Sequence, residues 1–410
     1  MSLLVMKFGG TSVASKDARH KAISRVRDAR EAGYRVVVVV SAMGRSGDPY
    51  ATDTLKGLLE EPDRDDGREV DLLLSCGEII SSVVFASELR REGLRASVLT
   101  GPQAGIVTDS THGEARVLGI ATSRLEGLLE EDIIPVVTGF QGATEDGEIT
   151  TLGRGASDTT ATALGAALGA ERVDIFTDVA GIMTADPDLV PEAGLLSHMR
   201  YAEVYEMASQ GAKVIHPRAV EIARQAQVPI RVVGLDGKRG TVIEDHEPLQ
   251  DIWANRTPAQ SISGVSAKTD VVQFSVRTPE NSAEVQRQIF RTLAEADISV
   301  DLINVFPDFC DFLIQEGDAG SARAILEALG VTVSLDSNVA KVSVVGSAIH
   351  GLPGVMSLIV DALVEKGITI LRTSDSNQSI SCLVPADRVS EAATALHRAF
   401  RLGAAPPAKE

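Results

Sequence analysis

The sequence is poor in cysteine and has none in pairs. Cys76, Cys310 and Cys382 are scattered through 410 residues without a Cys-x-x-Cys spacing. Three scattered cysteines without such a pair fit neither a disulfide framework nor a structural zinc site. None of the three has a neighbouring histidine or basic cluster to activate it as a nucleophile. We therefore expect a reduced protein in which each cysteine is a small, buried apolar side chain.

Positive charge and long apolar runs are also scarce. The formal net charge is −18 and the pI is about 4.9. A surface this acidic repels nucleic acid and anionic lipid. The longest apolar run, Val36 to Val40, is too short to span a bilayer, and Lys7 interrupts the apolar start that a signal peptide would need. These features predict a cytoplasmic protein that binds neither nucleic acid nor membrane.

Three common nucleotide-binding motifs are missing. The sequence has neither the G-x-x-x-x-G-K-[ST] pattern of P-loop enzymes nor the H-R-D catalytic loop of protein kinases. Gly153-Arg-Gly-Ala does not match the dinucleotide fingerprint. A phosphotransferase of this sequence would therefore belong to neither of the first two classes, and a dehydrogenase is unsupported.

What is present first is an alternation of strands and helices. Leu3 to Phe8 is a predicted buried strand, and the next helix has Ser15 at its N-cap and Gly33 beyond its end. Arg35 to Val40 is almost pure valine, as in a strand covered on both faces. The pattern predicts a parallel sheet between helices. Further expected helices cover 78–92, 114–130, 158–168, 204–208 and 218–226, and further strands 97–99, 134–138, 173–177 and 230–233.

The C-terminal part contains a repeat of about 70 residues. Leu293 to Val300 aligns with Leu363 to Ile370, and the strand Val272 to Val276 aligns with Val342 to Gly346. Each copy is predicted to follow a βαββαβ order. The expected domains are a large α/β domain (1–240), a linker (241–265), two small modules (266–336 and 340–402) and a disordered tail (403–410).

Two segments have the residue types that bind phosphate and carboxylate groups. Lys7 to Val13 places a lysine, two glycines and hydroxyls between a strand and a helix, which suits an anion, although Gly-Gly after a strand is also a common plain turn. Thr150 to Thr160 brings Arg154, Ser157 and Asp158 to the start of a helix. Asp158 could be a simple N-cap, but a cap does not require an arginine between glycines.

Both segments resemble motifs of the aspartate kinases. Further blocks match that family in the same order: Ser41-Ala-Met-Gly, Gly77-Glu78, Gly139-Phe-Gln-Gly, Thr177-Asp178, Thr184-Ala-Asp-Pro and Gly211-Ala-Lys-Val-Ile-His-Pro. The repeat resembles the paired ACT domains that follow the kinase domain in that family. The likeness covers nearly the whole chain.

The resemblance implies an α/β fold and a reaction. The fold would be the amino acid kinase αβα sandwich with a mainly parallel sheet, followed by two ferredoxin-like ACT domains. MgATP would phosphorylate the side-chain carboxylate of L-aspartate to 4-phospho-L-aspartate, the first step towards lysine, threonine, methionine and diaminopimelate. Mg²⁺ would arrive with ATP, because the sequence shows no dense carboxylate cluster, and no metal site of the protein's own is expected.

The resemblance also assigns roles to residues. Lys7 would stabilise the transferring phosphoryl group, and Asp158 would hold Lys7 in place. Arg154 would bind the substrate α-carboxylate and Glu78 its α-ammonium. The other amino-acid-binding residues would be Ser41, Thr52, Gly155 and Ser157, and the ATP-binding residues Lys7, Phe8, Gly9, Gly10, Thr177, Asp178, Met183 and Lys213. By residue type alone, Glu78 could be a solvated first-turn carboxylate and Lys213 a surface lysine.

Three positions depart from the family pattern. Ala156 replaces a second glycine after Gly-Arg-Gly, which could restrict that loop. Met183 stands where tyrosine is common. Asp188 stands where arginine is common, which removes one expected contact to a nucleotide phosphate.

The ACT pair would bind lysine, threonine or diaminopimelate and join chains into a homodimer or larger homo-oligomer. The effector candidates are Asp301, Asn304, Val355 and Met356, although ordinary loop residues would look the same. The segments 210–222 and 304–307 are most similar to the diaminopimelate-sensitive type. The first copy has Pro279-Glu-Asn-Ser where the second has the turn Gly351-Leu-Pro-Gly.

Two rival functions are each consistent with part of the sequence. A glutamate or acetylglutamate kinase would share the fold, but the Lys-Phe-Gly-Gly-Thr-Ser opening and the paired ACT modules argue against it. A ligand sensor with an inactive kinase domain would not need Lys7, Arg154 and Asp158, all of which are present.

Overall fold

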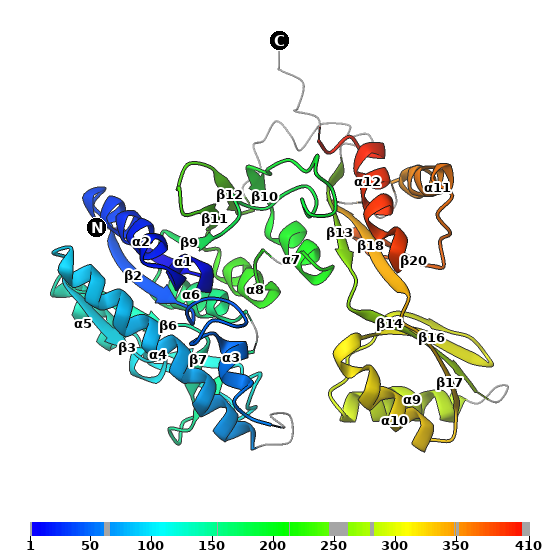
Figure 1. The fold of residues 1–410 in the computed structure, drawn as a ribbon, viewed down its shortest axis with the longest axis horizontal. Coiled ribbons are helices and arrows are strands. Elements are labelled where there is room, and N and C mark those ends of the chain that lie inside the picture. The colour runs from blue at the N-terminus through cyan, green and yellow to red at the C-terminus, as the bar shows by residue number, and fades with distance from the viewer. Residues whose placement is uncertain are drawn as a thin grey trace, which may run out of the picture. The chain divides into compact units, whose positions relative to one another are not determined.

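The computed structural model describes residues 2–60, 66–153, 155–212, 214–245, 261–278, 283–347, 349 and 352–403. The chain forms two compact units (Figure 1). The first takes in the described residues of 1–182, 195–208 and 213–245. The second takes in 183–194, 209–212 and the described residues from 261 onwards.

The first unit is built on an eight-stranded sheet in the order β10-β12-β11-β9-β1-β2-β6-β3. All neighbouring pairs are parallel except β11 with β12. The strands are β1 (Leu3–Phe8), β2 (Arg35–Val40), β3 (Ala96–Leu99), β6 (Ile134–Thr138), β9 (Arg172–Thr177), β10 (His198–Met199), β11 (Ile230–Gly234) and β12 (Gly240–Ile243). The helices are α1 (Gly10–Ala14), α2 (Lys16–Glu31), α3 (Thr52–Lys56), α4 (Gly67–Arg91), α5 (Ser123–Glu130), α6 (Ser157–Ala167), α7 (Tyr201–Ser209) and α8 (Pro217–Ala226).

The alternation of side chains along β1 determines what lies on each face. Leu4, Met6 and Phe8 pack in one core cluster with buried residues of α2 and α4. Lys7 points to the opposite face, where its amine meets Asp158 of α6. The sheet is therefore covered on both sides, and the expected αβα sandwich with a mainly parallel sheet is confirmed.

A smaller sheet, in the order β5-β4-β7-β8, lies in the same unit. Its strands are β4 (Ile106–Thr108), β5 (Val117–Ile120), β7 (Gln141–Ala143) and β8 (Ile149–Thr151). The helix expected over 114–130 is wrong in its first half, because 117–120 pairs with β4 as a strand and the helix begins only at Ser123. The expected helix 78–92 begins earlier, at Gly67, where Asp66 accepts a hydrogen bond from Arg68 N as the N-cap.

By length and composition alone, α4 could cross a membrane. It is nevertheless more than half buried inside the unit, where Phe85, Ala86 and Leu89 pack against the sheet. It also carries two buried carboxylates, Asp71 and Glu78. These features are those of a core helix.

The second unit contains two modules that each have a four-stranded antiparallel sheet. The first comprises β14 (Val271–Arg277), α9 (Ala283–Glu295), β15 (Asp301–Val305), β16 (Phe309–Gln315), α10 (Ala319–Ala328) and β17 (Thr332–Asp336). The second comprises β13 (Ile262–Lys268), β18 (Val339–Gly346), α11 (Val355–Glu365), β19 (Arg372–Asp375), β20 (Ser379–Pro385) and α12 (Val389–Ala399). The strand orders are β15-β16-β14-β17 and β13-β18-β20-β19.

The second module is discontinuous in sequence. Among the described residues no strand follows α12, and β13 pairs antiparallel with β18 at the position that β17 holds in the first module. The first module is thus inserted between β13 and β18. The expected module boundary at residue 266 falls inside β13, so the structure differs from that expectation. The backbone groups at the edge of β18 need a pairing strand, and the preceding segment supplies it.

A segment between β9 and β10 belongs to the second unit. Ala185 and Val190 pack in the core of the second module with residues of α11 and α12. The buried His397 Nε2 lies 2.9 Å from Thr184 Oγ1. The domain boundary expected at residue 240 therefore follows the order of the chain, but it does not include the earlier segment that packs in the second unit.

We expect His397 to make the second unit sensitive to acid. Burial lowers the pKa of His397, so the folded state disfavours the imidazolium. Its contribution to stability is therefore complete above the ordinary histidine pKa of 6.5 and is lost as the pH falls through the lowered value. Thermal unfolding of wild type and His397→Gln at pH 7.5 and 5.5 should show a smaller acid-induced loss in the variant. An equal loss in both proteins would contradict this account.

Candidate active site

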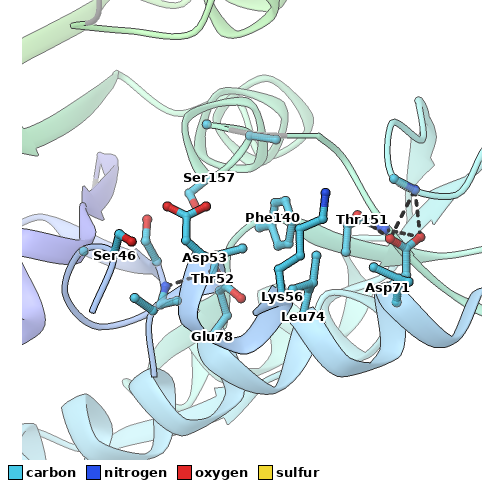
Figure 2. Close-up of a pocket in the computed structure, with 18 of the residues that line it drawn as sticks. Ser46, Thr52, Asp53, Lys56, Asp71, Leu74, Glu78, Phe140, Thr151 and Ser157 are labelled. Atoms are coloured by element: carbon cyan, nitrogen blue, oxygen red, sulfur yellow. Dashed lines mark hydrogen bonds between the residues drawn. The ribbon is translucent and has the colours of Figure 1, made fainter. Parts of the chain in front are cut away.

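A cavity of about 570 Å³ opens in the first unit, beside the carboxyl ends of β1 and β2. Helix α4 forms one wall, with Asp71, Leu74 and Glu78 along it, and Ser157 at the start of α6 approaches from the other side (Figure 2). Eight of the predicted site residues line it: Lys7, Gly10, Ser41, Thr52, Glu78, Gly155, Ser157 and Asp158. Residues predicted from segments distant in sequence are thus brought to one place.

Lys7 and Asp158 form an ion pair in this cavity. Lys7 Nζ lies 2.7 Å from Asp158 Oδ1, and both side chains are mostly buried. His216 N donates to the other carboxylate oxygen over 3.3 Å. Asp158 is therefore not the N-cap of α6, which begins at Ser157, but a partner that fixes the lysine amine at the cavity wall.

The two glycines after β1 have different structural roles. The N–H of Gly9 donates to Phe176 O over 3.3 Å, so this N–H already has an acceptor in β9. A Cβ on Gly10 would lie 2.6 Å from Gly44 O and 2.8 Å from Ala42 O. Gly10 is therefore required for the close approach of the loop after β2, in addition to any approach of a phosphate.

Glu78 has the most perturbed environment in the cavity. Its side chain is on α4, it is 2% exposed, and its Oε1 accepts a hydrogen bond from Ala42 N over 3.0 Å. Within the part of the chain that the structure describes, Oε2 is buried without a hydrogen-bond partner. Burial raises the pKa of Glu78 to about 8, against the opposing effect of the Ala42 hydrogen bond. A buried carboxylate of this kind requires either a proton or a cation, and the solvated first-turn alternative is wrong.

The other predicted amino-acid-binding residues that the structure describes line the same cavity and come from three separate segments. Ser41 follows β2 and donates its N–H to Phe8 O, and Thr52 is the first residue of α3. Ser157 begins α6, preceded by Gly155 at φ +79°. Arg154 lies outside the described residues, so its role stays a prediction.

The structure places only some of the predicted ATP-binding residues in the same unit. Phe8, Thr177 and Asp178 belong to the first unit, where Asp178 accepts a hydrogen bond from Thr177 Oγ1 and forms an ion pair with Arg45. Met183 belongs by its contacts to the second unit, so the structure does not group it with them. Lys213 lies outside the described residues.

Two of the three departures can be placed. Ala156 is fully buried and packs with Leu74, Phe140 and Leu152, so its methyl group fills an apolar cluster and does not strain the loop at φ −75°. Asp188 donates its N–H to Asp186 Oδ1 in an exposed turn.

Sequence reasoning missed several residues of the cavity, among them Asp71, His112 and Phe140. The sequence signal for Asp71 is a carboxylate within an apolar run, seven residues before Glu78 and hence on the same face of one helix. Phe140 has φ +70°, which is unusual for an aromatic residue. Its backbone is fixed by hydrogen bonds with Thr160 Oγ1 and Leu152 N.

Gly139, next to Phe140, allows the start of α6 to approach the sheet. A Cβ there would lie 2.6 Å from Ser157 Oγ. We expect Gly139→Ala to displace Ser157 and lower the kcat/KM for the amino-acid substrate by about tenfold or more. Gly127→Ala is the control, because Gly127 lies within α5 with open space around it and should gain about 0.5–1 kcal/mol of stability at unchanged activity. Equal effects of the two substitutions on kcat/KM would contradict this role.

The effector candidates have diverse surroundings. Asp301 forms an ion pair with Lys341, which is 3% exposed on β18, and Asn304 Nδ2 donates to Leu302 O. Val355 is buried in the core of the second module, so it does not present a side chain to a ligand, whereas Met356 is exposed. The segment Pro279 to Ser282 and Gly351 lie outside the described residues.

Comparison with known proteins identifies the family. Residues 2–234 match the amino acid kinase family, and residues 334–398 match an ACT domain. Aspartokinase 1 of Bacillus subtilis (strain 168) is 47% identical over 98% of this chain and 100% of its own length. The chain belongs to the aspartokinases of the amino acid kinase family.

Solved aspartokinases share its fold. E. coli aspartokinase III in complex with aspartate and ADP (R-state) matches with a TM-score of 0.81 at 26% identity, over 97% of this chain and 99% of that one. The same enzyme in complex with lysine and aspartate (T-state) matches with a TM-score of 0.73 at 25% identity, over the same shares of the two chains. This aspartokinase chain is therefore a kinase with an amino acid kinase domain followed by ACT-type modules.

Proposed function

We propose that this chain transfers the γ-phosphate of ATP to the side-chain carboxylate of L-aspartate, giving 4-phospho-L-aspartate. The observation that carries the proposal is the buried Glu78, whose Oε2 lacks a hydrogen-bond partner among the described residues. Glu78 lines the cavity that also holds the Lys7–Asp158 pair. A substrate ammonium group satisfies that carboxylate at the distance of a hydrogen bond.

The two residues assigned to the ends of the aspartate backbone are opposite in charge to those ends. Glu78 is assigned to the α-ammonium group and Arg154 to the α-carboxylate. Ser41, Thr52, Gly155 and Ser157 complete the amino-acid site. The side-chain carboxylate then faces Lys7, which is held by Asp158. A carboxylate is already ionised at neutral pH, so this nucleophile needs no general base.

The chemical step is an in-line displacement. A side-chain oxygen of aspartate forms a bond to the γ-phosphorus, and the bond from that phosphorus to the bridging oxygen of ADP breaks. Negative charge spreads over the phosphoryl oxygens in the transition state. Lys7 lies where it can offset that charge, and the ion pair with Asp158 keeps its amine from reorienting during the step.

The nucleotide is assigned to the side of the site formed by Lys7 to Gly10, Thr177 and Asp178, with Met183 and Lys213 as further ligands. Arg45 and Asp178 form an ion pair on this side. Mg²⁺ enters bound to ATP and offsets charge on its phosphates.

Regulation is assigned to the ACT-type modules. A related aspartokinase III has been solved with lysine, which supports an amino-acid effector here. We assign feedback inhibition to lysine, threonine or diaminopimelate, with the diaminopimelate-sensitive type as the first candidate and Asp301, Asn304 and Met356 as contacts. The enzyme would act in the cytoplasm as a homodimer or larger homo-oligomer, at the first step towards lysine, threonine, methionine and diaminopimelate.

The test is acyl-phosphate formation trapped with hydroxylamine. Purified protein receives MgATP with aspartate, with glutamate or without an amino acid, and the hydroxamate is measured. Lysine, threonine and diaminopimelate are then added one at a time. Turnover with aspartate but not glutamate, suppressed by one of the three, supports both parts of the proposal. Folded protein without turnover on aspartate would overturn it, and turnover that none of the three suppresses would overturn the assigned regulation alone.

A further inference from the structure

A second buried carboxylate on α4, that of Asp71, receives hydrogen bonds from two distant segments. Asp71 is 0% exposed. Gly113 N donates to both of its oxygens at 3.1 Å, Thr151 N donates to Oδ2 at 3.0 Å, and Thr151 Oγ1 donates to Oδ1 at 2.5 Å. His112 Nδ1 lies 2.9 Å from Oδ2 (Figure 2 shows the contacts to Asp71 as dashed lines).

Burying the Asp71 carboxylate costs solvation free energy. We therefore expect this carboxylate to have a role that an apolar side chain could not fill. A buried charge needs several strong donors to offset the loss of water, and an apolar residue of similar size often stabilises a core equally well. The donors of Asp71 lie 41, 42 and 80 residues away along the chain. The carboxylate therefore fixes the positions of the turn at 112–113 and of the end of β8 relative to α4.

The end of β8 leads directly into the loop with Arg154. After Thr151 the chain runs through Leu152 to Ala156, with Gly153 at φ +89° and Gly155 at φ +79°. Glycines in such conformations add little rigidity to a loop, so its position depends on its two ends. The C-terminal end is α6. The N-terminal end is the strand that Asp71 binds, assisted by the hydrogen bond from Leu152 N to Phe140 O.

Helix α4 therefore carries both the Glu78 carboxylate and the attachment of the opposite loop. Asp71 and Glu78 are seven residues apart, about two helical turns, and line the same cavity. We propose that Asp71 is a positioning residue, which fixes the distance between Glu78 and the 152–156 loop and so sets the affinity for the amino-acid substrate. This inference rests on the proposed function, in which the two ends of the substrate backbone bind at those two places.

The test compares Asp71→Asn with a buried carboxylate elsewhere. Asn keeps the shape but places an amide NH₂ against donors, so the end of β8 loses part of its attachment. Asp174→Asn is the matched control, because Asp174 is also buried in the first unit, is paired with Arg172 on β9 and does not line the cavity. Thr151→Val, which removes only the 2.5 Å hydroxyl contact, is a milder variant for the case in which Asp71→Asn does not fold.

The readouts are kcat, the KM for aspartate, the KM for ATP, and hydrogen exchange of the 149–156 amides. We expect Asp71→Asn to raise the KM for aspartate at least tenfold, with the KM for ATP changed less than twofold, and to speed exchange in 149–156. Thr151→Val should act in the same direction by less. Asp174→Asn should lower the unfolding temperature but leave the KM for aspartate and the exchange in 149–156 unchanged.

Two outcomes would overturn the inference: a lower unfolding temperature with an unchanged KM for aspartate, or equal increases in both KM values. If the wild type does not turn over aspartate, the proposed function fails. Hydrogen exchange then still decides whether Asp71 controls the loop, because unchanged exchange in 149–156 would overturn that role without any activity measurement.

Discussion

Lys7→Met should lower kcat by about a thousandfold or more while the protein stays folded. The lysine amine is a cation at the cavity wall, 2.7 Å from Asp158 Oδ1. Methionine has a similar length and packs well, so the fold loses a charge but not volume. The measurement is single-turnover acyl-phosphate formation, together with the KM for aspartate and the circular dichroism of the variant.

The controls separate the loss of chemistry from the loss of structure. Lys16→Met removes an exposed lysine of α2 and should leave kcat unchanged. The Lys7→Met variant leaves Asp158 without its cation, so the double variant with Asp158→Asn should recover stability but not activity. A Lys7→Met enzyme that retains more than a tenth of wild-type kcat would show that Lys7 is not the group that stabilises the transferring phosphoryl group.

Glu78→Gln should raise the KM for aspartate by about a hundredfold or more, because an amide cannot offset the charge of an α-ammonium group in a buried site. The KM for ATP should change little. In the wild type, the pKa of Glu78 near 8 means that the empty site is mostly protonated at neutral pH. Aspartate binding must then displace that proton.

The pH dependence follows with a definite sign. Aspartate affinity should rise by up to tenfold per pH unit from pH 6 to about 8 and then level off, because only the ionised Glu78 binds the ammonium group. Calorimetry in two buffers of different ionisation enthalpy should show close to one proton released per aspartate at pH 7. Glu78→Gln should remove both effects. An affinity that is independent of pH between 6 and 8 would contradict the assigned partner.

The same pKa has a consequence for stability. Glu78 titrates near 4.5 when unfolded and near 8 when folded, so the folded state holds more protons between those values. The stability that Glu78 contributes therefore falls as the pH rises from 4.5 to 8. Glu78→Gln should accordingly be more stable than the wild type at pH 9. The wild type is less stable at this pH because it keeps the buried carboxylate that the binding site needs.

The sequence was sufficient for the parts of the fold that local patterns determine. The valine run of β2 predicted a strand covered on both faces, and Ser15 predicted the start of α2, where its hydroxyl accepts from Ala18 N. The motif residues Lys7, Glu78 and Asp158 were predicted to share a site, and all three line the cavity.

Other features depend on partners far away in the sequence. The strand over 117–120 was read as helix because its identity comes from pairing with β4, which lies outside any local window. The place of β13 in the second module is likewise determined by an unpaired edge of β18, about 80 residues later in the chain. Asp71 could not be assigned a function until Gly113 and Thr151 were seen around it.

We propose that the cavity between β1 and α4 is the aspartate site, with Glu78 at the ammonium end and Lys7 at the reacting end. A crystal structure with aspartate and MgADP tests this proposal. We expect the α-ammonium group within hydrogen-bond distance of Glu78 Oε2 and the side-chain carboxylate beside Lys7 Nζ. Aspartate bound with its ammonium group away from Glu78, or outside this cavity, would contradict it.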